Sequence, residues 1–285
     1  MTAHLVLSAV APIPREAAMA IAAAADCGAL AARGSRALEA EAPDADPARR
    51  AAARAAAGEA ALDVNLVTRR GPPRLLICDM DSTVITVECI DEIAALAGVG
   101  PAVAAVTERA MRGELDFEQA LAERVATLAG LDESALERVW TERVRLSPGA
   151  AAMTAAFRAA GAETALVSGG FTFFTERVAA AAGFDSHRAN RLEIAGGRLT
   201  GRALPPILGR AAKRARLEEL AAAGGYAPEA AVAVGDGAND LDMAAAAGLS
   251  VAWRAKPALA EAADARLDHS DLSAVAVLAG LAPAA

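Results

Sequence analysis

The sequence predicts a doubly wound α/β fold, in which a parallel sheet carries helices on both faces. Three short apolar runs support this prediction, at Leu75–Cys78, Thr164–Val167 and Ala231–Val234. Runs of this length and composition are typical of strands buried on both faces. Helix-forming stretches separate them, and alternating strands and helices favour a parallel sheet. The 285 residues leave room for this domain and a smaller one.

The first seventy residues predict a small α+β module that precedes the main sheet. A strand-like apolar start at Leu5–Val10 is followed by alanine-rich helices, expected at about 15–32 and 48–61. Gly71-Pro72-Pro73 marks a linker to the main domain. We expect residues 1–70 to serve packing or homodimerisation, and a degenerate amino-acid-sensing domain is the alternative.

Residues 87–145 predict charged helices without a strand, inserted after the first strand of the sheet. The main domain resumes at Ser147-Pro148-Gly149, and Ala195-Gly196-Gly197 then separates two strand-like segments as in a hairpin. A helix at about 213–223, a helix after Asn239 and a strand at 249–252 complete the alternation. The chain therefore divides into 1–70, 87–145, and a main domain formed by 74–86 and 146–285.

Polar residues follow each of the three predicted sheet strands. Asp79 and Asp81 follow the first strand, Ser168-Gly169-Gly170 the second, and Gly235-Asp236-Gly237-Ala238-Asn239-Asp240 the third. Any one of these motifs could be a solvated turn, because Asp is common there. A parallel sheet brings all three to one edge, where α/β sheets bind ligands. Two carboxylates there can supply a nucleophile and a proton carrier, and glycine amides can contact phosphate oxygens.

Composition limits the classes of partner. The net charge of −8 argues against a nucleic-acid-binding protein. It also means that local cations and a metal, rather than the overall field, must hold an anionic substrate. Cys27, Cys78 and Cys89 form no C-x-x-C pair, which favours a reducing compartment. No targeting segment or membrane-length apolar span is visible, so we expect a cytoplasmic protein without a membrane partner.

Four parts of the sequence together point to one family. They are Asp79–Thr83 with Glu88–Ala94, Met111–Phe117 leading to Leu121 and Arg124-Val125, Ala189–Leu192 with Leu199–Gly201, and Asp271–Ser273. These segments resemble the haloacid dehalogenase (HAD) superfamily of phosphohydrolases, and within it the phosphoserine phosphatases. The resemblance covers roughly residues 74–280. It implies a HAD-like core, a helical cap over 87–145, and Mg²⁺-dependent hydrolysis of O-phospho-L-serine, the last step of L-serine biosynthesis.

The resemblance implies an aspartyl-phosphate mechanism. Asp79 would be the nucleophile, and Asp81 would protonate the leaving oxygen and then activate water. A carboxylate and a phosphate repel each other, by about 4 kcal/mol for unit charges 4 Å apart in a moderate dielectric. A cation is therefore required, and Asp79, Asp236 and the backbone carbonyl of Asp81 would hold Mg²⁺. Asp240 would lie behind these ligands, or would be an ordinary helix-start residue.

The resemblance also assigns the phosphate contacts. Ser168, the amide of Gly169, Lys213 and Asn239 would hold the phosphate group. Lys213 is selected only by the pattern Pro-Ile-Leu-x-x-x-x-Lys, because several other cations lie near it in the same predicted helix. This chain has Gly209 where the family usually has an aspartate, a departure that affects a loop.

Specificity for serine would come from the cap. Glu88 would pair with the substrate ammonium and Arg124 with its carboxylate. Phe117 lies seven residues before Arg124, on the same face of a helix, and would close over the substrate, while Met111 would line the apolar wall. Glu88 could instead be a surface helix start, and Arg124 could be replaced by Arg109, Arg112 or Arg143.

Three other functions are weighed against this one. A HAD phosphatase acting on another small phosphomonoester is the nearest, and the set of Glu88, Phe117 and Arg124 discriminates against it. A dehalogenase is disfavoured because its chemistry does not need the acid at Asp81. An amino-acid-binding regulator acting through residues 1–70 would predict a disabled core, whereas every catalytic position is present.

Overall fold

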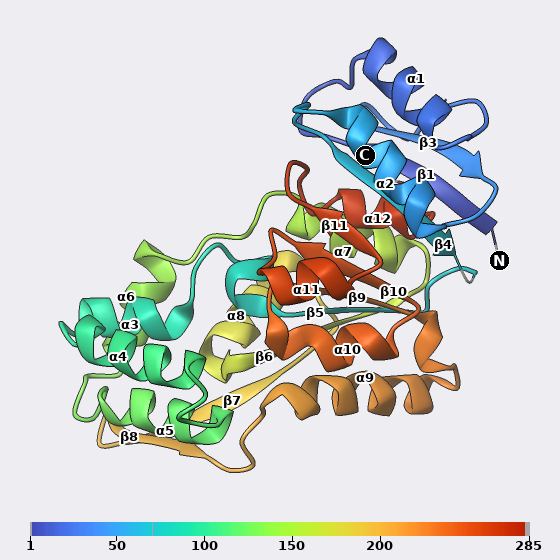
Figure 1. Cartoon of the computed structure of the whole chain (residues 1–285). Coiled ribbons are helices and arrows are strands. Elements are labelled where there is room, and N and C mark those ends of the chain that lie inside the picture. Colours follow the sequence, from blue (N-terminus) through green and yellow to red (C-terminus); the bar gives the residue numbers. More distant parts are fainter. Residues whose placement is uncertain (1, 70, 283–285) are drawn as a thin grey trace.

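The computed structural model describes residues 2–69 and 71–282, which form two sheets, the helices packed on them and a helical cap. An N-terminal module lies at one end of the molecule and a helical cap at the other, with the larger sheet between them (Figure 1). The larger sheet has seven strands in the order β11-β10-β9-β5-β6-β7-β8. Its strands are β5 (Leu75–Cys78), β6 (Glu163–Phe171), β7 (Ser186–Ala195), β8 (Arg198–Leu204), β9 (Ala231–Gly235), β10 (Leu249–Trp253) and β11 (Ala265–Leu267).

The predicted doubly wound sheet is confirmed. Every neighbouring pair of strands is parallel except β7 and β8, which form the predicted antiparallel hairpin. Side chains alternate between the two faces of β5. Leu76 and Cys78 join the core under one helical layer, and Leu75 and Ile77 join the core under the other. The first layer contains α7 (Ala150–Ala159), α8 (Thr172–Ala182) and α12 (Ala274–Leu278), and the second contains α9 (Arg210–Gly224) and α10 (Leu241–Ala246); α11 (Pro257–Ala262) follows β10.

The segment between β5 and α7 folds as a cap of four helices. Its apolar side chains, among them Ile93, Leu121 and Val139, belong to the same buried cluster as one face of the large sheet. The β7–β8 hairpin supports the cap from below, because the backbone of Leu199 exchanges hydrogen bonds with Gly130 and Leu131. The cap helices are α3 (Cys89–Leu96), α4 (Gly100–Met111), α5 (Phe117–Ala126) and α6 (Ser134–Glu142).

The N-terminal module (residues 2–69) has its own antiparallel sheet, in the order β2-β3-β1-β4, and its own apolar core. The prediction of a helix to residue 32 was wrong, because the helix ends at Ala24 and Asp26 then takes a left-handed conformation with φ 52°. The second helix ends at Ala57, before Gly58 with φ 56°. The elements are β1 (Thr2–Ser8), α1 (Arg15–Ala24), β2 (Ala31–Ala32), β3 (Ala37–Ala42), α2 (Pro47–Ala57) and β4 (Asp63–Arg69).

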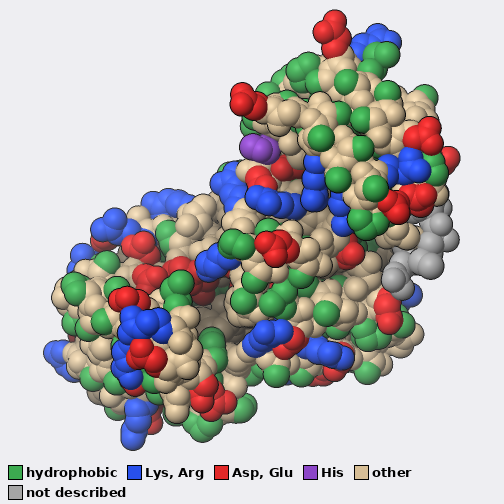
Figure 2. Space-filling model, in the orientation of Figure 1, with side chains coloured by type: hydrophobic (Ala, Val, Ile, Leu, Met, Phe, Trp, Pro, Cys, Tyr) green, Lys and Arg blue, Asp and Glu red, His purple; other side chains and the backbone are tan. Residues whose placement is uncertain are grey.

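Buried polar side chains of β4 attach the module to the large sheet. Asn65 pairs with the backbone of Arg266 in β11, accepting its N–H at 2.8 Å and donating to its carbonyl at 2.9 Å. Asp63 accepts the backbone N–H groups of three successive residues, 268–270. Lys and Arg side chains also gather at this junction (Figure 2), where Arg54 and Arg266 line one small cavity. Asn65 and Asp63 are buried and hydrogen-bonded across the junction, so these contacts attach the module to the core.

Within the described ranges, no helix combines the length and the apolar character needed to cross a membrane.

Candidate active site

The predicted strand ends meet at the carboxyl edge of the large sheet. Cys78 of β5 lies beside Leu166 of β6 and Val234 of β9, so the residues that follow these strands converge. They border a cavity of about 430 Å³ between the cap and the sheet, where the surface is hollowed (Figure 2). Of the predicted site residues, the cavity is lined by Asp79, Asp81, Glu88, Met111, Phe117, Arg124, Ser168, Gly169, Asp236 and Asn239, whereas Lys213 and Asp240 lie buried behind it.

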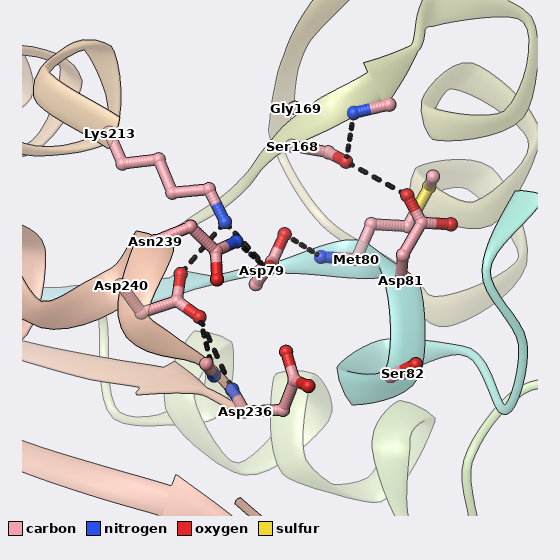
Figure 3. Close-up of polar contacts among 12 residues, drawn as sticks. Asp79, Met80, Asp81, Ser82, Ser168, Gly169, Lys213, Asp236, Asn239 and Asp240 are labelled. Atoms are coloured by element: carbon pink, nitrogen blue, oxygen red, sulfur yellow. Dashed lines mark hydrogen bonds and ion pairs between the residues drawn. The ribbon is translucent and has the colours of Figure 1, made fainter. Parts of the chain in front are cut away.

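Asp79 is held at the floor of this cavity by three donors. Its Oδ1 accepts the N–H of Met80 at 2.7 Å. Its Oδ2 lies 2.6 Å from Lys213 Nζ and accepts from Asn239 Nδ2 at 3.1 Å. Figure 3 shows Lys213 and Asn239 reaching Asp79 from the same side. These contacts hold the carboxylate in one orientation and leave it facing the cavity.

Lys213 is a buried cation between two carboxylates. Its Nζ lies 2.6 Å from Asp79 Oδ2 and 2.8 Å from Asp240 Oδ1, and its side chain is 2% exposed. Burial disfavours the charged amine, but Asp79 and Asp240 outweigh burial and hold the pKa of Lys213 above its ordinary value. Lys213 therefore keeps its positive charge beneath the cavity.

Asp79, Asp236 and Asp240 form the acidic cluster of the site. One carboxylate oxygen from each lies within 4.8 Å of the others. Asp240 is already engaged, because its Oδ2 accepts the N–H groups of Asp236 and Gly237 and its Oδ1 faces Lys213. Burial, followed by the charge of Asp79, raises the pKa of Asp240 to about 7. Asp79 Oδ1 accepts one N–H group and Asp236 faces the exposed Lys256, so both carboxylates can also take a cation. Asp240 orients the loop that carries Asp236.

Glycine is required at the foot of this loop. A Cβ atom at Gly235 would lie 2.4 Å from the carboxyl group of Asp240, far inside van der Waals contact. The glycine that ends β9 therefore allows Asp240 to fold back under the loop.

Asp81 lies in the turn after β5, in which Ser82 has a φ of 54°. Its Oδ1 accepts the N–H of Cys89 at 3.0 Å, and its Oδ2 accepts from Ser168 Oγ at 3.3 Å. Burial, followed by the nearby charge of Glu88, raises the pKa of Asp81 to about 7. A carboxyl group with such a pKa can both give and take a proton near neutral pH.

The prediction that Ser168 follows the end of its strand was wrong, because β6 continues to Phe171. The register with β7 shifts between Val167 and Phe171, so the backbone bulges there. Within the bulge, Ser168 Oγ accepts the N–H of Gly170 at 2.8 Å. A Cβ at Gly170 would lie 2.5 Å from Asp81 Oδ2. Glycine therefore lets this strand approach the Asp81 carboxyl group.

The cap contributes Glu88 and Arg124 to the opposite wall. Glu88 accepts from Ser82 Oγ at 2.8 Å, and burial raises its pKa. Arg124 donates to its own helix at Ala120, and burial lowers its pKa. Among the described residues it forms no ion pair within 4.0 Å. The alternatives Arg109, Arg112 and Arg143 are each paired with glutamates and do not line the cavity.

Met111 and Phe117 complete the cap side of the cavity. Phe117 begins α5, whose start is fixed by a capping box between Asp116 and Gln119. Met111 lies at the cavity mouth and is 84% exposed. Phe117 shares the apolar wall with Ile90, Leu115 and Leu121, and Met111 borders the mouth.

Lys256 is a site residue that the sequence interpretation missed. It lines the cavity, and its Nζ lies 3.2 Å from Asp236 Oδ2. It follows β10, a fourth strand of the same parallel sheet. A cation just after the predicted strand at 249–252 was the available signal. Asn190, in a segment that was noted only for its resemblance, is a second missed residue and is described below.

Comparisons with known proteins agree with this geometry. Residues 76–245 match the family of haloacid dehalogenase-like hydrolases. A phosphoserine phosphatase of Albidiferax ferrireducens is 48% identical over 204 residues, which are 70% of this chain and 86% of that protein. A HAD family hydrolase of Salmonella enterica superposes with a TM-score of 0.88 at 29% identity, covering 97% of this chain and 98% of the other. A probable phosphoserine phosphatase of Vibrio cholerae superposes with a TM-score of 0.79 at 34% identity, covering 97% and 88%. The chain belongs to the family of haloacid dehalogenase-like hydrolases.

Proposed function

We propose that this protein hydrolyses O-phospho-L-serine to L-serine and phosphate. The observation that carries the proposal is the pairing of two sites across one cavity. Asp79 and Asp81 face it from the sheet, while Glu88 and Arg124 face it from the cap. The first pair suits transfer of a phosphoryl group, and the second suits an ammonium and a carboxylate on the same substrate. The names of the relatives support the same substrate.

The reaction proceeds in two steps. Asp79 Oδ attacks phosphorus, the bond between phosphorus and the serine oxygen breaks, and Asp81 gives its proton to that oxygen. L-Serine leaves and an aspartyl-phosphate remains on Asp79. Asp81, now ionised, takes a proton from water as the water oxygen attacks phosphorus. The bond between phosphorus and Asp79 Oδ breaks, phosphate leaves, and the Asp79 carboxylate and protonated Asp81 are restored.

The acidic cluster fits a divalent cation of the Mg²⁺ type, which prefers oxygen ligands. Asp79 and Asp236 would hold it with their carboxylates and Asp81 with its backbone carbonyl, while Asp240 supports the Asp236 loop. When bound, Mg²⁺ supplies positive charge that offsets the repulsion between the Asp79 carboxylate and the substrate phosphate. Ser168, the Gly169 amide and Asn239 surround the phosphate oxygens from the protein side. Lys213, which lies behind Asp79, adds positive charge beneath the phosphate.

Serine is recognised from the cap in this proposal. Arg124 pairs with the substrate carboxylate and Glu88 with its ammonium. Phe117 covers the short side chain, and Met111 borders the entrance. A substrate without the amino-acid group would lose these contacts and keep those to the phosphate.

We also infer a cytoplasmic enzyme that dimerises through the N-terminal module. Cys27, Cys78 and Cys89 are all free thiols, in keeping with a reducing compartment. Val10 and Met19, in the module, are large apolar side chains with more than half their surface exposed. Light scattering after gel filtration tests the dimer, and a monomer at micromolar concentration would contradict it.

The substrate is tested by phosphate release from phosphoserine and p-nitrophenyl phosphate, with Mg²⁺ and with EDTA. We expect Arg124→Ala to lower kcat/KM for phosphoserine by about thirty- to several-thousand-fold, the cost of leaving a buried charge without its partner. Hydrolysis of p-nitrophenyl phosphate should be nearly unchanged. Arg109→Ala is the matched control, because Arg109 lies in the same cap but pairs with Glu123. Equal loss for both substrates would contradict the role of Arg124.

A further inference from the structure

Asn190 is a buried side chain near the site that the proposed chemistry does not use. It lies in β7 and is 1% exposed. Its Nδ2 donates to the carbonyl of Gly169 at 2.8 Å and to the carbonyl of Leu208 at 3.3 Å, and its Oδ1 accepts the N–H of Leu208 at 2.7 Å. One carboxamide therefore joins the bulge of β6 to the segment that leads into α9.

Both joined segments carry a glycine against the same aromatic ring. A Cβ atom at Gly169 would lie 3.0 Å from Phe117 Cζ, and one at Gly209 would lie 3.0 Å from Phe117 Cδ1. Gly209 has a φ of −101°, which any residue can adopt. A side chain at position 209 is therefore limited by the nearness of the ring, which would have to move, and not by the backbone conformation.

The ring belongs to the cap, whereas both glycines belong to the core. Phe117 is the first residue of α5, and its ring lies over the two backbone segments at the edge of the cavity. The same two segments bear Ser168 on one side and, four residues beyond Gly209, Lys213 on the other. The spacing of these segments thus determines how the Phe117 ring of the cap meets the core.

We propose that Asn190 is a positioning residue for cap closure, which holds Gly169 and Gly209 at the spacing that seats the Phe117 ring. The inference rests on the proposed function, because closure of Phe117 over the substrate is part of it. When the three hydrogen bonds of Asn190 are removed, the two segments can separate and the ring loses its fixed seat. When a methyl group is added at Gly209, the ring is pushed away from the core. Both changes lie outside the acidic cluster and act on the position of the cap, which carries Phe117 and Arg124 on one helix.

The test is a double-mutant cycle with Asn190→Ala, Gly209→Ala and Phe117→Leu, which replaces the ring by a smaller side chain. Gly209→Ala should raise KM for phosphoserine by about 5- to 150-fold, the range for overpacking by one methyl group. The value of kcat for p-nitrophenyl phosphate should change less than twofold. In the Phe117→Leu background, both Asn190→Ala and Gly209→Ala should have little further effect on KM, since the ring that they displace is absent.

A readout without substrate separates this inference from the proposed function. Backbone hydrogen exchange of the first turn of α5 should be faster in Gly209→Ala and Asn190→Ala than in the wild type. Exchange in α3 should be unchanged in both variants. If the wild-type protein does not hydrolyse phosphoserine, the proposed function fails. The exchange result still tests whether Asn190 holds Gly169 and Gly209 against the Phe117 ring. Unchanged exchange in α5, or effects on KM that add in the Phe117→Leu background, would overturn the role of Asn190.

Discussion

Replacement of Lys213 by methionine should destabilise the protein strongly, because two buried carboxylates then lose their common cation. Lys213 Nζ lies 2.6 Å from Asp79 and 2.8 Å from Asp240, and all three side chains are nearly inaccessible to water. Removing one partner of a buried ion pair costs about 3–5 kcal/mol. At about 2–4 °C per kcal/mol for a domain of this size, the melting temperature should fall by roughly 6–20 °C. The measurement is thermal unfolding of the metal-free protein at pH 8.

Lys256→Met is the matched control for this experiment. Lys256 also faces an aspartate of the site, but its side chain is 68% exposed, and exposed pairs contribute about 0–1 kcal/mol. The Lys213→Met deficit should shrink at pH 5, where Asp240 can take up a proton. A Lys213→Met protein that unfolds at the same temperature as Lys256→Met at pH 8 would refute the assignment of a buried cation.

Three further substitutions test Asp79, Asp81 and the attachment of the N-terminal module. Asp79→Asn should reduce phosphate release to below about 1% of wild type, a loss above roughly 3 kcal/mol, with an unchanged circular dichroism spectrum; substantial residual turnover would contradict its role as nucleophile. Asp81→Asn should stabilise the metal-free protein at pH 8 by roughly 1–3 kcal/mol in urea. Burial is the main cause that raises the pKa of Asp81 to about 7. The folded state therefore binds more protons than the unfolded state between about pH 4 and 7, and it loses stability as the pH rises through this range. The stability gained by Asp81→Asn should vanish near pH 4. Asp63→Ala should cost about 2–3 kcal/mol, because three successive N–H groups, that of the buried Ser270 among them, lose a charged acceptor. It should also speed proteolysis at the junction of the module; unchanged proteolysis would contradict the attachment.

The fold and the convergence of the strand-end residues at one cavity could be predicted because the strand and the groups that follow it are adjacent in sequence. An apolar run followed by Asp79 and Asp81 specifies both the strand and the groups at its end. Parallel pairing then brings the motif at Asp236 to the same edge without further information. The Gly196-Gly197 hairpin was predictable for the same reason, since its turn residues are adjacent.

The remaining features depend on contacts that are distant in sequence. The hydrogen bonds of Asn190 cross 21 and 18 residues to backbone atoms, which carry no sequence signal. The length of β6 depends on pairing with β7, so the bulge at Ser168 could not be placed from its own residues. In the N-terminal module, alanine favours helix at every position, and the end of α1 is set by the left-handed Asp26 and by pairing of the strands that follow.

The contact between β4 and β11 also bears on how the protein avoids aggregation through the edge of its large sheet. β11 is an outer strand of the seven-stranded sheet, and the free N–H and C=O groups of such a strand form a template on which another chain can add. The carboxamide of Asn65 occupies one N–H and one C=O of Arg266, as a neighbouring strand would, and Asp63 occupies the N–H groups just beyond. The N-terminal module thus acts as a cover for the open side of the sheet, and a chain lacking it would expose a ready site for aggregation.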